Sequence, residues 1–101
     1  MQNTNPIPER LKAARKKAKI TQKDLGVKIG MEPSSASGRM NHYEKGRHVP
    51  DISTLKRMAE ELGVPLNYFF CEDQLSAELA CVIEKMSEEE KKRLLFELAR
   101  K

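Results

Sequence analysis

Three glycines, at positions 30, 46 and 63, each follow a short segment in which apolar residues recur at every third or fourth position. That spacing places the apolar side chains on one face of a helix. A glycine directly after such a segment is typical of a helix that ends in the left-handed conformation. No segment shows the alternation of apolar and polar residues that a half-buried strand requires. The pattern therefore predicts an all-α fold built from short helices.

Residues that favour helix starts predict the other ends of these helices. Thr21 and Asp51 are good N-cap residues, and Ser87 with Glu90 matches a capping box. Pro8 stands in a first helical turn, where proline is tolerated. Together these signals predict seven helices, over residues 8–19, 21–30, 34 or 35–46, 51–63, 65–70, 75–86 and from 87 onward. Residues 1–6 have no periodicity and are expected to form a loose tail.

The apolar faces of the first five helices predict one modest core. Its expected members are Ile7, Leu11, Ala14, Ala18, Leu25, Ile29, Ala36, Met40, Tyr43, Ile52, Leu55, Met58, Ala59, Leu62, Leu66, Phe69 and Phe70. The last two helices carry further large apolar residues, namely Leu79, Val82, Ile83, Met86, Leu94, Leu95 and Leu98. These residues either cover the core or form a seam between two copies of the chain, and we favour the seam. Cys71 and Cys81 are expected to be free, half-buried thiols, because two sparse cysteines make no disulfide framework.

The charge of the chain is distributed unevenly. Residues 1–57 contain 13 Lys and Arg against 5 Asp and Glu, whereas residues 58–101 contain 6 against 10, for a net charge of +4 overall. A basic front half favours a polyanionic partner. No apolar run approaches the roughly 20 residues that span a membrane, and no signal peptide is evident, so we expect a cytoplasmic protein without a membrane partner. The sequence shows no metal cluster, phosphate loop or nucleophile–base arrangement. We therefore predict no cofactor, no metal and no enzymatic activity.

The outer face of the third predicted helix is polar but lacks acidic residues. With Ala36, Met40 and Tyr43 turned inward, the residues left outside are Ser35, Ser37, Gly38, Arg39, Asn41 and His42. Ser, Asn, Arg and His side chains bind base edges and phosphates in the major groove, which is about 12 Å wide. Gly38 leaves room for the close approach of another backbone. This composition favours a DNA-contacting surface over an ordinary solvated face.

The order of the helices supports the same interpretation. The segments "LKAARKKAKITQKDLGVKIG" and "RMNHYEKGRHVPDISTLKRMAEELGVPLNYFF" resemble the lambda-repressor-like (Cro-type, XRE) helix-turn-helix family over about residues 8–70. The resemblance implies a five-helix DNA-binding domain at residues 1–70 that recognises operators as a dimer. Residues 71–101 lie outside the resemblance and form a C-terminal helical extension, for which dimerisation is one possible role.

The resemblance also implies roles for individual residues. The third helix becomes the recognition helix, in which Arg39 and His42 contact bases or phosphates and Asn41 contacts adenine or the DNA backbone. Gln22 is expected at a phosphate or a base. Arg15 and Glu44 match a partly buried salt bridge that joins helix one to helix three. The full set of candidate DNA-contacting residues is Thr21, Gln22, Lys23, Ser35, Ser37, Gly38, Arg39, Asn41, His42, Lys45 and Arg47.

Two departures from the family pattern lie around the second and third helices. About four extra residues separate Gly30 from Glu44, and they either lengthen the turn or add one turn to the start of helix three. Gly26 stands where the family usually has alanine, and both residues are small enough for the two helices to cross closely.

These features predict a sequence-specific regulator of transcription that binds double-stranded DNA. The first hypothesis is a repressor of phage or prophage type that binds a palindromic operator as a homodimer. The alternative is an antitoxin that binds a toxin protein and also represses its own operon. The alternative requires an exposed apolar surface, in residues 71–101, that the homodimer leaves free.

Overall fold

The computed structural model describes residues 5–100, which form six α-helices and one 3₁₀-helix without any strand. The elements are α1 (Ile7–Lys17), α2 (Gln22–Lys28), α3 (Pro33–Glu44), α4 (Ile52–Leu62), η1 (Leu66–Phe70), α5 (Gln74–Glu84) and α6 (Glu88–Ala99). The predicted all-α fold is confirmed, with five helices followed by two more. Residues 1–4 of the predicted tail lie outside the described part of the chain.

Side-chain caps begin the helices where the sequence predicted them. The backbone N–H of Asp24 donates to Oγ1 of Thr21 at 3.0 Å, which caps α2. At the start of α4, the backbone N–H of Thr54 donates to Oδ1 of Asp51 at 2.8 Å. Each oxygen satisfies a backbone donor that the helix itself leaves without a partner.

The last two helices begin in the same way. Ser87 and Glu90 form the predicted capping box of α6, with backbone-to-side-chain hydrogen bonds of 2.8 and 3.1 Å. Asp73, which the sequence analysis left in a linker, caps α5 by accepting from the backbone N–H of Ser76 at 3.1 Å. α5 and α6 therefore have well-defined starting points.

The three glycines that follow predicted helices all adopt positive φ angles, of 102° at Gly30, 76° at Gly46 and 70° at Gly63. This conformation is strained for other residues and ends a helix without cost at glycine. The prediction that these glycines end helices is confirmed.

Two predicted helix boundaries and part of the predicted tail are wrong. α3 begins at Pro33, one or two residues earlier than expected, because proline is well suited to the first helical position. The extra residues therefore lengthen α3 and not the turn. α1 ends at Lys17, and Lys19 has a positive φ of 58°. The side chain of Asn5 accepts from the backbone N–H of Ile7 at 3.1 Å, so residue 5 is held at the start of α1, which Pro6 directly precedes.

The core lies between α1, α2, α3, α4 and η1, and most of its predicted members are buried. Its largest fully buried side chains are Leu11, Leu25, Met40, Leu55, Met58 and Phe69. Ala18, Ile52 and Phe70 are exposed, so these three core assignments are wrong. Ala18 follows the last turn of α1, and Ile52 is the first residue of α4. η1 is a 3₁₀-helix, which has three residues per turn. Phe70 therefore points away from the face that Phe69 occupies.

Arg10, on α1, departs from the general expectation that arginine side chains lie in solvent. Its side chain is buried, with 4% exposure. Nε donates to the carbonyl of Cys71 at 2.9 Å, and Nη1 donates to Oε1 of Gln74 at 2.8 Å. Arg10 therefore ties α1 to the chain that enters α5. Burial raises the pKa of the nearby Tyr68 phenol, and the charge of Arg10 opposes that shift.

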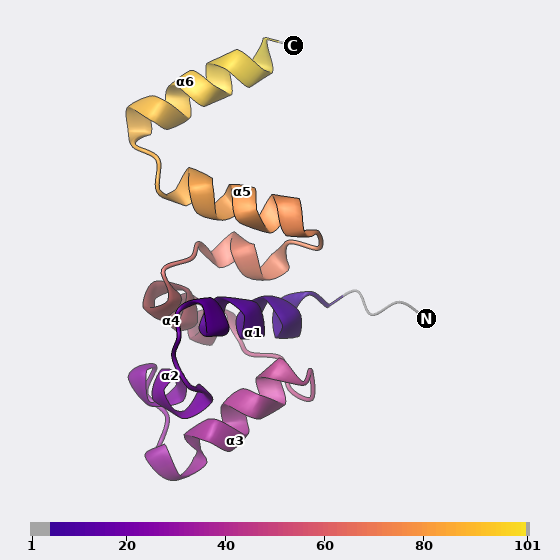
Figure 1. The fold of residues 1–101 in the computed structure, drawn as a ribbon, viewed down its shortest axis with the longest axis vertical. Helices are drawn as coiled ribbons and strands as arrows, with labels where there is room; N and C mark the ends of the chain where they lie inside the picture. Colours follow the sequence, from indigo (N-terminus) through magenta and orange to yellow (C-terminus); the bar gives the residue numbers. More distant parts are fainter. Residues whose placement is uncertain (1–4, 101) are drawn as a thin grey trace.

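The molecule is elongated, with principal extents of 52 × 35 × 22 Å. α2 and α3 lie at one end, and α5 and α6 lie at the other (Figure 1). α5 buries Ala77 and Ala80 against the body, whereas no residue of α6 is buried. Cys71 and Cys81 are free and half-buried, as predicted. The large apolar residues of α5 and α6 that the sequence analysis singled out do not cover the core.

Candidate nucleic-acid interface

α2 and α3 pack against each other at a contact that only glycine permits. A Cβ atom added to Gly26 would lie 2.8 Å from Cβ of Ala36 and 3.2 Å from the Ala36 carbonyl oxygen. The first distance is shorter than two carbon atoms adopt and the second is tight, and neither atom can move without moving the backbone of α3. The predicted close crossing of helices two and three is confirmed, and it fixes how α3 is presented. The expectation that alanine would also fit at position 26 is wrong.

The predicted salt bridge between α1 and α3 is also present. Nε of Arg15 lies 2.5 Å from Oε2 of Glu44, and Nη2 donates to Oε1 at 3.1 Å. Nη1 of the same arginine donates to the carbonyl of Ile20 at 2.9 Å. The side chains are 12% and 2% exposed. This two-pronged pairing is geometrically specific, and it holds the last turn of α3 against α1 and the segment that leads into α2.

Gln22 and Asn41, two of the candidate DNA-contacting residues, are joined to this salt bridge. Nε2 of Gln22 donates to Oε1 of Glu44 at 3.1 Å and to Oδ1 of Asn41 at 3.3 Å. Both amide side chains are half-buried. Sequence patterns do not predict this contact, because the two residues are 19 positions apart and meet only where α2 crosses α3.

The remaining outer residues of α3 face solvent. Ser35, Ser37, Gly38 and Arg39 are all exposed. A Cβ atom added to Gly38 would meet nothing within 4 Å, so this glycine serves no packing contact within the chain. Within residues 5–100, Arg39 forms no hydrogen bond or ion pair. Its guanidinium is therefore free to bind a partner.

The C-terminal end of α3 carries a histidine pair that the sequence analysis did not predict. The half-buried His42 ring stands edge-on to the His48 ring, with centroids 5.1 Å apart and an interplanar angle of 88°. Lys45 and Arg47 are exposed in the same short segment after α3. Thr21 and Lys23, also exposed, lie at the start of α2. The candidate residues thus occupy two packed helices and the segment that follows them.

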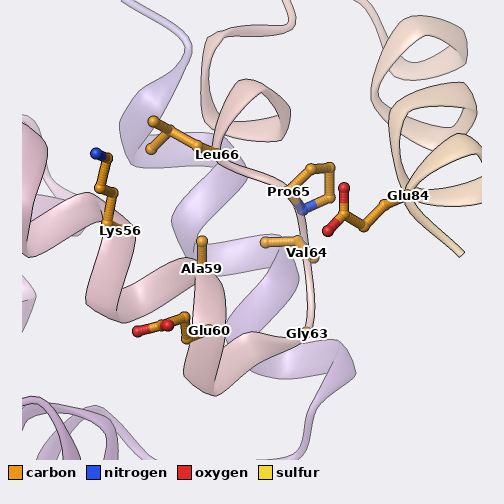
Figure 2. A pocket seen from close by; sticks show the side chains of 8 residues that line it. All are labelled: Lys56, Ala59, Glu60, Gly63, Val64, Pro65, Leu66 and Glu84. Atoms are coloured by element: carbon orange, nitrogen blue, oxygen red, sulfur yellow. The ribbon is translucent and has the colours of Figure 1, made fainter.

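A separate hollow of about 560 Å³ lies between the end of α4 and the end of α5. Figure 2 shows its lining, with Lys56 and Glu60 on α4 and Glu84 approaching from α5 beside Pro65. None of the candidate DNA-contacting residues lines it. Among the described residues, no cluster of three or more His, Cys, Asp or Glu side chains is suited to bind a metal. Within the same part of the chain, no helix combines the length and apolar character needed to cross a membrane.

The geometry of α2 and α3 defines the class of this protein. Two short packed helices, a tight turn at Gly30 and a second helix with an exposed polar face make a helix-turn-helix unit. A sequence model described as the helix-turn-helix domain matches residues 9–71, and the chain belongs to this family. Its helix-turn-helix domain is of XRE type, as in the transcriptional regulators among the similar proteins, and this class of domain is not enzymatic.

Similar proteins come from yeasts, a slime mould and bacteria. The chain is 38% identical over 60 residues to Multiprotein-bridging factor 1 of Debaryomyces hansenii, covering 59% of this chain and 37% of that protein. It is 36% identical over 63 residues to Vegetative-specific protein H7 of Dictyostelium discoideum, covering 61% and 57%. It is 31% identical over 70 residues to HTH-type transcriptional regulator ImmR of Bacillus subtilis, covering 69% and 52%. The chain thus spans less than two thirds of the length of these relatives.

A solved structure matches nearly the whole chain. The crystal structure of transcriptional regulator BswR superposes with a TM-score of 0.86 at 40% sequence identity, and the match covers 94% of both chains. This match extends well beyond residues 9–71, so it includes helices of the C-terminal extension.

Proposed function

We propose that this protein is a sequence-specific repressor, of phage or prophage type, that binds a palindromic operator as a homodimer. The observation that carries the proposal is the outer face of α3, which is exposed, polar and free of acidic residues. The Gly26–Ala36 contact and the Arg15–Glu44 salt bridge hold this face rigidly. A rigid helix of this kind suits the major groove, because it loses little conformational entropy on binding.

The proposal assigns two kinds of contact to the candidate residues. Ser35, Ser37, Gly38, Arg39, Asn41 and His42 enter the groove. The residues that flank them contact phosphates, namely Thr21, Lys23, Lys45 and Arg47. Phosphate contacts set the register of the protein on the duplex, whereas base contacts select the sequence. The half-buried free thiols fit a reducing compartment, and we place this activity in the cytoplasm.

Selection of binding sites from random duplexes, combined with a mass measurement of the bound species, tests the proposal. We expect one enriched palindrome with half-sites about 10 base pairs apart and two chains per duplex. The affinity should fall steeply with salt, because each neutralised phosphate contributes a slope of about −0.9. An unenriched library would contradict sequence-specific binding.

Arg39 and Lys45 provide a matched pair of variants. Arg39→Ala should relax the preference at one base pair, because a two-pronged arginine–guanine contact contributes about 1–3 kcal/mol of discrimination. Lys45→Ala should weaken all sequences alike and make the salt slope shallower by about 1. Binding titrations on the selected site and on single-base variants of it measure both effects. A uniform loss in both variants would contradict the role of Arg39.

The proposed dimer uses the extension at residues 71–101. Its large apolar side chains, which are 40–71% exposed, are Leu75, Leu79, Val82 and Ile83 on α5 and Leu95, Phe96 and Leu98 on α6. A helix of 12 residues is marginal on its own in water, and α6 buries nothing against its own chain. Pairing with a second copy would supply the missing contacts, and a standard interface buries roughly 800 Å² per partner.

The same apolar face supports the antitoxin alternative, in which a toxin protein covers α5 and α6. The oligomeric state of the purified chain separates the two hypotheses. A stable homodimer that consumes this face favours the repressor. A chain that stays monomeric at high concentration, and represses only when a second protein is added, favours the antitoxin.

A further inference from the structure

The hydrogen bonds of Gln22 determine which way its side-chain amide points. A carboxylate oxygen can only accept, so the atom of Gln22 that faces Glu44 must be the NH₂ group. The same NH₂ group contacts Asn41, which must therefore turn its carbonyl oxygen toward Gln22. Glu44 thus fixes the orientation of both amides, and Arg15 in turn holds Glu44.

This orientation leaves each amide with one kind of group to offer a partner. Both N–H bonds of Gln22 are used, so its free atom is the acceptor Oε1. The Oδ1 atom of Asn41 accepts from Gln22, so its free group is the donor Nδ2. Both side chains are half-buried and not closed off. A phosphate oxygen only accepts, so the side chain of Gln22 has no free donor to offer it.

A free acceptor and a free donor, on two side chains that contact each other, match one base edge of the major groove. Adenine presents the N6 amino donor beside the N7 acceptor on a single base. Guanine presents two acceptors, thymine an acceptor and a methyl group, and cytosine a single donor. We propose that Gln22 and Asn41 together recognise one adenine in each half-site. Oε1 of Gln22 accepts from adenine N6, and Nδ2 of Asn41 donates to adenine N7.

This inference rests on the proposed function, because it requires that α3 enters the groove. It goes beyond that function because it assigns to two residues the adenine N6 and N7 contacts that a single Asn or Gln amide can make. Arg15 and Glu44 act as positioning residues, since they fix the two amides and do not touch the base. The preformed network removes the need to order either side chain on binding.

The test uses the full chain and the operator half-site obtained by selection. Each adenine is replaced in turn by 7-deazaadenine, which lacks the N7 acceptor. We expect the wild type to lose affinity at one adenine by about two- to tenfold, the effect of one neutral hydrogen bond. Asn41→Ala should bind the natural site more weakly but show no further loss with 7-deazaadenine at that position. Arg39→Ala serves as the control and should keep the full 7-deazaadenine effect.

A second variant tests the polarity of the contact. Asn41→Asp keeps an oxygen for Gln22 but offers an acceptor where adenine N7 needs a donor. In a repeated selection we expect this variant to lose the adenine preference at that position and to keep the others. Thermal melting verifies that both Asn41 variants are folded, and Asn41→Ala carries the test if Asn41→Asp is not.

The outcomes separate the inference from the proposed function. If the wild type enriches sites but no 7-deazaadenine weakens binding, the inference is wrong and the proposed function stands. The same conclusion follows if Asn41→Ala remains as sensitive to 7-deazaadenine as the wild type. If the wild type enriches no sequence, the proposed function fails and the inference falls with it.

Discussion

Gly26 in α2 and Gly38 in α3 should respond in opposite ways to replacement by alanine. Gly26→Ala forces a methyl group against Ala36, an overpacking that typically costs about 1–3 kcal/mol. Gly38→Ala meets open space and should stabilise α3 by up to about 1 kcal/mol. Urea unfolding of the two variants measures the difference. Equal stability would mean that α2 and α3 cross less closely than described.

The salt bridge between Arg15 and Glu44 should contribute far more to stability than the surface pair of Glu97 and Arg100. Glu44→Ala leaves the guanidinium without its partner in a site that is 12% exposed, and we expect a loss of about 3 kcal/mol. Glu97 lies 3.8 Å from Arg100, and both side chains are more than 60% exposed. Exposed pairs of this kind contribute little, so Glu97→Ala should melt like the wild type. A melting temperature for Glu44→Ala equal to that of Glu97→Ala would contradict this ranking.

Single residues also show what the sequence could not predict. Arginine is rarely buried, so pattern alone places Arg10 in solvent. Its partners, Cys71 and Gln74, are 61 and 64 positions away. The contact between Gln22 and Asn41 likewise depends on how two helices cross. Local periodicity has no information about either, whereas the Arg15–Glu44 pair was predictable because a family resemblance encodes tertiary contacts.

At the scale of the helices, the sequence predicted starts and ends well because the signals are local. An N-cap side chain bonds a backbone N–H only three residues away, as at Thr21, Asp51 and Ser87. The early start of α3 had a local signal as well, since Pro33 suits the first helical position. No local signal indicates that Ile52 is exposed, because its exposure depends on how the helices pack.

Asp51 couples the stability of α4 to pH. The Thr54 backbone N–H that donates to its carboxylate holds the pKa of Asp51 below its usual value of 3.8. The stabilisation is therefore fully present above the unfolded pKa and is lost as pH falls through the folded pKa. Asparagine also caps helices but does not titrate. Melting temperatures of Asp51→Asn should thus fall less steeply than those of the wild type below about pH 4. Parallel melting curves for the two proteins in acid would contradict this linkage.

At the scale of the whole molecule, the helical content was predictable but the placement of α5 was not. The sequence drew attention to the large residues of this helix, yet the side chains that meet the body are Ala77 and Ala80. Small residues let α5 pack beside η1 (Figure 1). The large apolar residues of α5 are instead 40–71% exposed. Hydrophobic periodicity identifies an apolar face but cannot tell whether that face meets its own chain or another one.

The outward face of α5 leads to the prediction that spans the whole molecule. If two copies pair through residues 71–101, a charge in that face must separate them, because a buried unpaired charge is costly. Leu79→Glu should therefore shift the protein from dimer to monomer. Ile52→Glu is the matched control, since Ile52 on α4 is about as exposed as Leu79, at 53% against 58%.

Analytical ultracentrifugation of the two variants and the wild type measures the result directly. We expect dimers for the wild type and Ile52→Glu, and monomers for Leu79→Glu. Monomers keep α3 intact but lose the second recognition helix. Leu79→Glu should therefore bind a palindrome no more tightly than a single half-site, whereas the wild type prefers the palindrome strongly. If Leu79→Glu remains dimeric, the dimer interface lies outside residues 71–101. Dimer formation would then not explain why α6 buries no residue within its own chain.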